Sequence, residues 1–278
     1  MSKAPRSPAD QLVAKLRKDM ADIAMQARAT ELAPHGRRKL NQEIERAAQN
    51  LNALLAELDH VKRPRAIFDP GNPRTVGFFI ALAMTAQPRQ PLKSMGEFYG
   101  SGIYAIYFNG DYPLYEPVCR TETPIYVGQA ASGDENARTP AEQGLRLAAR
   151  LNEHRKNIER ANSLRIEDFE CRALVVQTGW ETGAEDYLIR LFRPIWNNET
   201  KLVFGLGKHG DSASTRRNKR SPWDTLHEGR AWAGAETLAD AKSPEKIAVE
   251  LGKHFAGTKI YKTFDDVLAG FVADLQQR

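Results

Sequence analysis

The sequence contains little cysteine: Cys119 and Cys171 are the two cysteines in a chain of 278 residues. Two cysteines cannot form the disulfide framework of a small secreted domain, so we expect reduced thiols and a cytoplasmic protein. No histidine or cysteine cluster has the spacing of zinc ligands, and the sequence therefore predicts no structural zinc. We expect a fold held together by its hydrophobic core.

Long hydrophobic runs are also missing. The longest covers residues 77–84, far short of the roughly 20 apolar residues that a membrane-spanning helix needs. The charged N-terminal stretch lacks the apolar segment of a signal peptide, which again favours the cytoplasm. Hydrophobic residues nevertheless make up 41% of the chain, enough for a sizeable core in one large or two modest domains.

The net charge of +5 is concentrated in one segment, residues 201–234, which holds seven lysines or arginines against three acidic residues and so contributes +4. A basic run is commonly a solvated loop, and it also suits the phosphates of a nucleic acid. On the second interpretation the DNA-contacting residues are Lys201, Lys208, Arg216, Arg217, Lys219, Arg220 and Arg230.

The N-terminal region has the pattern of two helices. Ser7 is placed to cap a helix over residues 7–29 whose first position is Pro8. In a second helix, over residues 37–61, apolar residues alternate at spacings of four and three, from Leu40 to Leu58, as in a coiled coil. These helices either pair with each other or the core, or they form a subunit interface, and the sequence leaves both options open.

Strand and helix patterns alternate in the middle of the chain. Residues 102–108 and 123–129 are rich in β-branched and aromatic residues and predict an antiparallel pair, with a third strand over 169–178. Helices are expected from about Pro140 and over residues 182–192, ended by Pro194. These elements predict an α+β fold: a small three-stranded, antiparallel-containing sheet flanked by helices, with an N-terminal helical arm and a C-terminal helical extension.

Five short motifs follow one another in this region. A Gly-Ile-Tyr tripeptide in the first strand precedes a Tyr-Val-Gly in the second; an Arg and a His four residues apart, a Glu in a helix and an Asn after Pro-Ile-Trp come next. Each motif alone is weak, and a tyrosine in a strand usually serves packing. The ordered set resembles the GIY-YIG nuclease superfamily, and its closing part resembles the type II restriction endonucleases that cut CCGCGG sites. The matching residues are Gly102, Ile103, Tyr104, Tyr126, Val127, Gly128, Arg150, His154, Glu185 and Asn197.

The resemblance implies roles for six of these side chains in phosphodiester hydrolysis. Tyr104 would be the general base, as a phenolate favoured by nearby positive charge, and Arg150 would bind the scissile phosphate. The other three catalytic candidates besides Glu185 are Tyr126, His154 and Asn197: Tyr126 would donate a hydrogen bond to phosphate or water, His154 would bond to the base or a phosphate oxygen, and Asn197 would hold a backbone or phosphate oxygen near the metal.

Glu185 is the predicted ligand of a single Mg²⁺, with Mn²⁺ as a substitute and with water and phosphate oxygens completing the shell. A second interpretation competes, because Thr182 and Glu185 have the spacing of a helix capping box. Asn197 has its own structural alternative as a turn residue that tolerates left-handed dihedral angles.

The resemblance also predicts the organisation and partners of the protein. A catalytic core over residues 93–200 would follow the arm and linker, 1–92, and precede a DNA-contacting loop with helices, 201–278. We expect a bacterial, cytoplasmic enzyme that cuts double-stranded DNA at a GC-rich palindrome as a homodimer, with a companion DNA methyltransferase and no membrane partner. The alternatives are a GIY-YIG nuclease of the repair or homing type and a non-catalytic DNA-binding protein.

Overall fold

The computed structural model describes residues 7–30, 34–58, 68–207, 219–234 and 238–276, and it divides into two units. Unit 1 covers residues 1–67 and contains the helices α1 (Pro8–Ala29) and α2 (Pro34–Leu58). Ser7 caps α1 as predicted, because its hydroxyl accepts from the Asp10 backbone N–H while the Asp10 carboxylate accepts from Ser7. The two N-terminal helices predicted from the sequence are therefore confirmed.

The apolar side chains of unit 1 are exposed. No residue of α1 is buried, and Leu12 is 69% exposed. On α2 the predicted seam residues Ile44, Leu51, Leu54 and Leu58 are exposed as well. Unit 1 thus has an apolar stripe, and the choice between a role in packing and a role as a subunit interface stays open.

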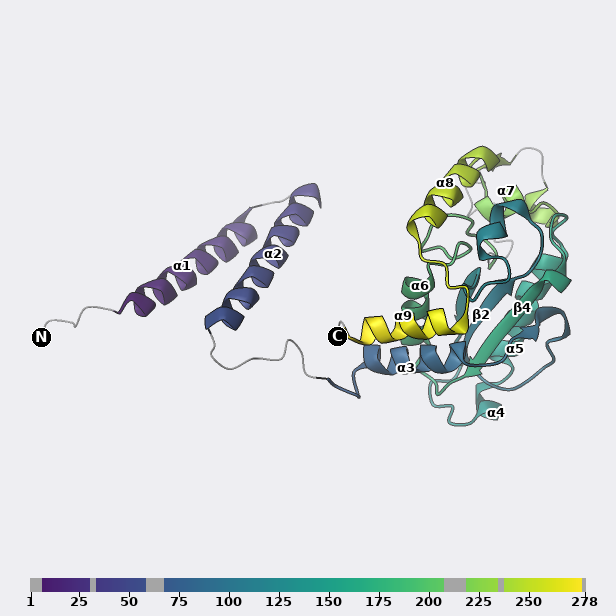
Figure 1. Ribbon diagram of the computed structural model, residues 1–278, viewed down its shortest axis with the longest axis horizontal. Helices are drawn as coiled ribbons and strands as arrows, with labels where there is room; N and C mark the ends of the chain where they lie inside the picture. The colour runs from purple at the N-terminus through teal and green to yellow at the C-terminus, as the bar shows by residue number, and fades with distance from the viewer. Residues whose placement is uncertain (1–6, 31–33, 59–67, 208–218, 235–237, 277–278) are drawn as a thin grey trace, which may run out of the picture. The chain divides into compact units, whose positions relative to one another are not determined.

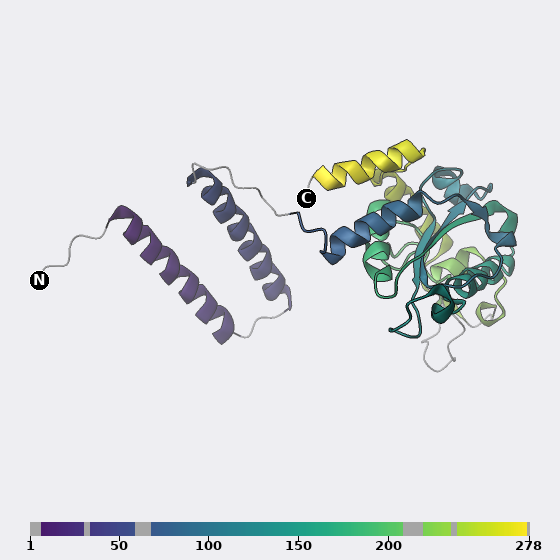
Figure 2. The same ribbon diagram turned by 90° about the horizontal axis from the view of Figure 1, so that it is seen from below.

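Unit 2 covers residues 68–278 and is built on an antiparallel sheet with the strand order β1-β4-β2-β3. The strands are β1 (Gln90–Pro91), β2 (Gly102–Phe108), β3 (Tyr126–Ala130) and β4 (Phe169–Val175). Every residue of β2 is buried, because strands flank it and helices cover both faces of the sheet (Figures 1 and 2). The predicted α+β class is confirmed, with β1 as a short addition to the three expected strands.

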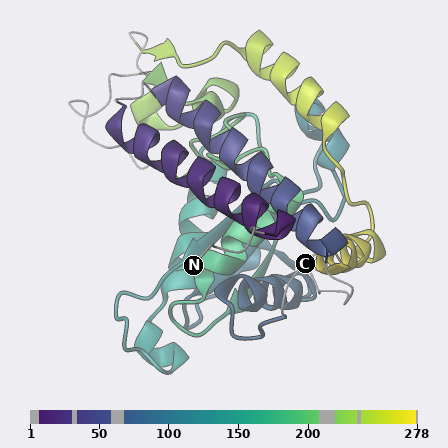
Figure 3. The same cartoon turned by 90° about the vertical axis from the view of Figure 1, so that its left-hand side faces the viewer.

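The two faces of β2 belong to two hydrophobic clusters. Ile103, Ala105 and Tyr107 pack toward α3 (Pro73–Thr85), α6 (Glu181–Phe192) and α9 (Phe264–Gln276). Tyr104, Ile106 and Phe108 pack toward α5 (Arg146–Glu159) and α8 (Pro244–Gly257). The α3 and α9 helices lie alongside each other, with Phe78 and Phe271 ring centroids 5.2 Å apart (Figures 1 and 3).

Several boundaries differ from the predicted ones. The helix expected from Pro140 is interrupted at Gly144, whose φ of 73° favours glycine, so that a single turn, α4 (Pro140–Gln143), precedes α5. The strand predicted over 169–178 ends at Val175. Further short elements are α7 (Pro222–Leu226), the parallel pair β5 (Lys219–Arg220) and β6 (Ala239–Asp240), and the 3-10 helices Leu92–Ser94, Pro113–Val118, Ile166–Asp168 and Ala231–Ala233.

No helix within the described ranges is long and apolar enough to cross a membrane.

Candidate active site

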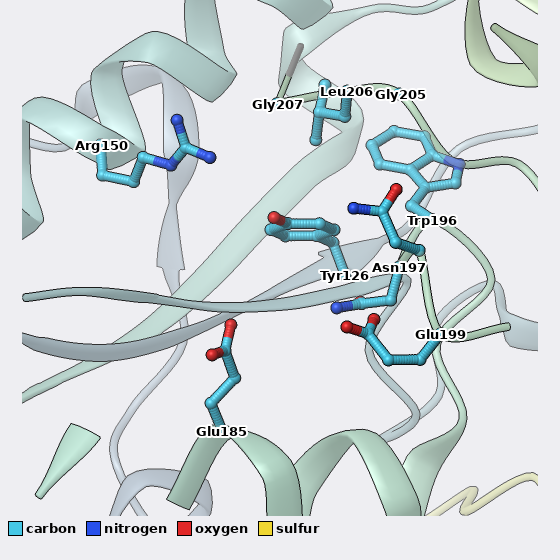
Figure 4. A pocket seen from close by; sticks show the side chains of 10 residues that line it. Tyr126, Arg150, Glu185, Trp196, Asn197, Glu199, Gly205, Leu206 and Gly207 are labelled. Carbon is cyan, nitrogen blue, oxygen red and sulfur yellow. The ribbon is translucent and has the colours of Figure 1, made fainter. Parts of the chain in front are cut away.

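A polar pocket of about 190 Å³ opens where β3, α5, α6 and the segment after Pro194 meet (Figure 4). It brings together four of the six predicted catalytic side chains, although they are far apart in the sequence. The lining residues are Tyr126, Arg150, Glu185, Trp196, Asn197, Asn198, Glu199, Gly205, Leu206 and Gly207. The other two candidates, Tyr104 and His154, are fully buried and lie behind this lining.

Tyr104 and His154 form a hydrogen-bonded pair beneath the pocket. The Tyr104 Oη atom lies 2.6 Å from His154 Nε2. Tyr104 faces Gly128 across the β2–β3 ladder, and a Cβ atom at Gly128 would lie only 2.4 Å from the tyrosine oxygen. The glycine of the Tyr-Val-Gly motif is therefore required by the tyrosine of the other motif, because any larger residue would displace its hydroxyl.

The surroundings of Tyr104 act on the predicted phenolate in opposite directions. Burial raises the pKa of Tyr104 well above its usual value, and the Tyr126 hydroxyl raises it further. The Arg150 guanidinium lowers the pKa of Tyr104, as predicted, but this effect is smaller than that of burial. These surroundings favour the neutral phenol over the predicted phenolate, and His154 Nε2 is the nearby group that could accept its proton.

Arg150 connects this buried pair to the pocket. It lies one helical turn before His154 on α5, as the spacing of four predicted. Its guanidinium pairs with Glu153 at 2.8 Å and is partly exposed toward the pocket. Gly207 lies so close that a Cβ there would be 2.7 Å from Arg150 Nη2, so the opposite wall of the pocket lies against the guanidinium.

Glu185 lines the pocket from the second turn of α6, and the capping interpretation is contradicted. The helix begins at Glu181, and Trp180 is its N-cap residue, without a side-chain cap. The Thr182 hydroxyl instead contacts the Gln129 side chain at 3.2–3.3 Å. Since the box would require Thr182 at the N-cap, the Glu185 carboxylate is not used in this way.

The Glu185 carboxyl has a strongly shifted pKa. Burial raises the pKa of Glu185 to about 7, and the carboxylates of Glu199 and Asp186 add to the shift, while hydrogen bonds from Gln129 oppose it. Sequence reasoning missed Glu199, which lines the same pocket from the loop. Glu185 and Glu199 extend carboxylates toward the same space from different elements (Figure 4). The sequence signal that could have identified Glu199 is its position two residues after the motif residue Asn197.

Asn197 acts on the backbone of β3. Its Oδ1 accepts a hydrogen bond from the Val127 N–H at 3.0 Å, and its Nδ2 donates to the Val127 carbonyl at 2.8 Å. The residue is 4% exposed, so its amide joins the loop to the middle residue of the Tyr-Val-Gly motif. Its alternative as a mere turn residue does not account for this pair of contacts.

The pocket offers oxygen ligands for a divalent cation. Mg²⁺ prefers oxygen donors and usually keeps several waters, binding through one or two carboxylates. Glu185 and Glu199 match that preference. Within the described ranges no group of three or more histidine, cysteine, aspartate or glutamate side chains could hold a metal by itself. The residues therefore fit a hydrated Mg²⁺, whose remaining ligands would come from water and phosphate.

The seven predicted DNA contacts divide into four groups, of which Arg230 forms the last. Lys208, Arg216 and Arg217 lie outside the described residues. Lys201 and Lys219 are exposed. Arg220 is partly buried and bonds to Asp240 at 2.8 Å, which links β5 to β6.

The DNA contact predicted for Arg230 is corrected by its burial. Arg230 is 2% exposed and lies 2.6 Å from the buried Asp224 carboxylate. Its guanidinium also donates to the carbonyls of Leu206 at 3.1 Å and Gly205 at 3.0 Å. A guanidinium enclosed in this way cannot reach a base edge, and it instead anchors one wall of the pocket.

Comparison with known families supports the same region of the chain. A family model described as the Eco29kI GIY-YIG domain matches residues 96–255, more than half of the chain, and covers every residue of the pocket. No curated protein sequence matches the chain.

Proposed function

Because the chain belongs to the Eco29kI GIY-YIG family, and is therefore a restriction-type DNA endonuclease, we propose that it is a type II enzyme that cuts both strands of a GC-rich palindrome. The products would carry 5′-phosphate and 3′-hydroxyl ends. The observation that carries the proposal is the pocket that unites Tyr126, Arg150 and Glu185 directly above the Tyr104–His154 pair.

The chemistry requires an activated water, a positive group for the phosphate and stabilisation of the leaving 3′ oxygen. In the proposed mechanism His154 Nε2 takes the proton of the Tyr104 hydroxyl. The resulting Tyr104 phenolate then accepts a proton from the attacking water. The new P–O bond forms as the bond to the 3′ oxygen breaks. Tyr126 would donate a hydrogen bond to phosphate or water from the pocket lining.

Arg150 would bind the scissile phosphate, because its guanidinium faces the pocket and stays charged at any working pH. Glu185, with Glu199 near it, would hold Mg²⁺ or Mn²⁺. A bound divalent cation would supply Lewis-acid stabilisation of the charge on the phosphate and leaving oxygens. Asn197 would keep β3 and the loop in register for these groups.

A homodimer fits a palindromic target, since two copies related by a two-fold axis would each cut one strand. The basic segment would add contacts to the DNA through Lys201, Lys208, Arg216, Arg217, Lys219 and Arg220. In a host that carries such an enzyme, a companion methyltransferase would protect the same site. The repair or homing type of GIY-YIG nuclease and a non-catalytic DNA-binding protein remain the alternatives.

One experiment separates these alternatives. A library of random sequences in a plasmid is digested with Mg²⁺, and the ends are sequenced. Cuts on both strands at one short palindrome would support the type II assignment. Nicks set by DNA structure, or one long asymmetric target, would favour the repair or homing type, and specific binding without any cut would favour a non-catalytic protein.

A further inference from the structure

A second hollow of unit 2 has four lysine or arginine residues in its lining and has no part in the site described above. Its cavity of about 590 Å³ lies between the C-terminal end of α6, the loop after Glu199 and α8. Four basic side chains face a single carboxylate there, so the lining has a net positive charge. The lining residues are Arg193, Thr200, Lys201, Leu202, Lys242, Glu250, Lys253, His254, Gly257 and Thr258.

The carboxylate is already matched by one of the cations. Lys242 Nζ lies 2.5 Å from Glu250 and also donates to the carbonyl of Lys201. Arg193, Lys201 and Lys253 are exposed, and none of the three pairs with a carboxylate in the part of the chain that the structure describes. Among the described residues, the hollow thus presents three exposed positive charges without a carboxylate partner.

Two of the residues that line this hollow directly follow, in the sequence, a residue that lines the catalytic pocket. Glu199 lines the pocket, and the next two residues, Thr200 and Lys201, line the hollow. Arg193 closes α6, the helix that carries Glu185, and eight residues of helix correspond to about 12 Å. Since phosphates of one DNA strand follow each other at a rise of about 3.4 Å, this distance corresponds to only a few nucleotides.

We propose that Arg193, Lys201 and Lys253, which form the basic groove of this hollow, bind backbone phosphates of the substrate DNA on one side of the cut. The proposal rests on the proposed function, because DNA is the polyanion that reaches the neighbouring pocket. Contacts to phosphates carry no sequence information, so the groove would fix the position of the duplex over the pocket and leave base recognition to other residues.

The structure also guides the choice of substitutions. Arg193 and Lys201 have positive φ angles of 48° and 55°, a conformation in which asparagine is tolerated. Lys253 lies on the exposed side of α8, where glutamine keeps the helix. The test protein is therefore the full chain with Arg193→Asn, Lys201→Asn and Lys253→Gln. The control removes three other exposed lysines that do not line the groove, with Lys246→Gln, Lys259→Gln and Lys262→Gln.

Binding to a specific duplex and to a random duplex is measured over a range of salt concentrations. We expect the groove variant to lose at least about tenfold in affinity for both duplexes at low salt, with a salt slope smaller by about 2 to 3. The control should bind like the wild type. Melting temperatures are recorded in parallel, since Arg193 also lies at the C-terminal end of a helix, where a cation stabilises the helix dipole.

An unchanged salt slope in the groove variant overturns the proposal, and a lower melting temperature with unchanged binding would show that the cations serve the helix ends alone. Loss confined to the specific duplex also overturns it, because base contacts would then be responsible. Cleavage by the wild type is assayed separately: a wild type that binds DNA through the groove without cutting it would refute the proposed function and leave this inference standing.

Discussion

Unit 2 contains two tyrosine–histidine hydrogen bonds of almost equal length in different surroundings. Tyr104 Oη lies 2.6 Å from His154 Nε2, directly behind the pocket. Tyr115 Oη lies 2.5 Å from His227 Nε2, in an aromatic cluster that also contains Tyr112, Trp196 and Trp223. Burial raises the pKa of both tyrosines well above the usual value. A short bond to histidine and a buried phenol are therefore not sufficient to mark a catalytic group.

The neighbours of the two pairs distinguish them. Tyr115 also accepts a hydrogen bond from Trp196 Nε1 at 3.0 Å, and Ser163 occupies the other nitrogen of His227 at 2.8 Å. The Tyr115 hydroxyl and both ring nitrogens of His227 thus have protein partners, as in a structural network. Beside Tyr104 lies Arg150, a charged side chain that opens toward the pocket. The comparison teaches that access to a polar pocket, and not the short bond or the burial, distinguishes the Tyr104–His154 pair from the Tyr115–His227 pair.

The largest effect on cleavage should come from a substitution in the pocket itself that leaves both tyrosine–histidine pairs unchanged. Replacing Glu185 with Gln removes the negative charge that would hold Mg²⁺, and we expect no detectable cleavage at any useful Mg²⁺ concentration, with specific binding retained. Thermal unfolding should change little, because the charge is already disfavoured by burial. The control is Asp186→Asn, a change at the exposed neighbour. Cleavage near the wild-type rate in Glu185→Gln would refute the metal assignment.

The two tyrosines can be compared directly through the same substitution. Tyr104→Phe should lower the cleavage rate by roughly 10²- to 10⁴-fold, the usual contribution of a general acid–base group. Tyr115→Phe should leave the rate close to wild type and lower the free energy of unfolding by about 1–3 kcal/mol, because His227 and Trp196 lose a partner in the interior. Single-turnover cleavage and denaturant unfolding measure the two effects. Equal rate losses would abolish the distinction between the pairs.

The structural pair should also be visible in the pH dependence of stability. Burial lowers the pKa of His227 to about 3, with a smaller contribution from the charge of Arg230, whereas the unfolded chain takes up the proton near pH 6.5. Between these values the unfolded state binds more protons, so stability is present above pH 6.5 and falls as the pH decreases toward 3. The slope from this group is about 1.4 kcal/mol per pH unit.

Denaturant unfolding from pH 7 to pH 4.5 would measure this slope in the wild type and in His227→Gln, which cannot take up a proton. The variant should be less stable at pH 7 and show a flatter profile. A profile as steep as that of the wild type would assign the acid sensitivity to other groups.

The smallest effect on unit 2 is expected from changes in unit 1, which contains neither tyrosine–histidine pair. Changing Leu51 and Leu54 to Glu introduces charges into the exposed stripe of α2. If this stripe joins subunits, sedimentation should shift toward the monomer, while the melting transition of unit 2 stays within about 0.5 kcal/mol of wild type, as for surface changes. An unchanged oligomer would remove unit 1 from the interface.

Local sequence signals predicted several elements well. The Ser7–Pro8 start of α1, the pairing of the two motif strands and the alternation of side chains across β2 follow from capping, β-propensity and the period of two. The break at Gly144 and the start of α6 at Glu181 were not predicted. Both depend on contacts with distant residues: Gln143 bonds to Ser101 and Val176, and Glu181 bonds to Ser101.

The sequence alone determined which chemical groups this protein possesses and, through their order, the family to which it belongs. Only the tertiary structure decided what each group can reach. Arg230 belongs to a strongly basic segment, yet Asp224 and two carbonyls enclose it, because burying a guanidinium requires such partners. Glu199 carries no motif, yet the loop held by Asn197 brings it to Glu185. Chain order is a local property, whereas burial, pairing and pKa depend on segments that meet only in the folded molecule.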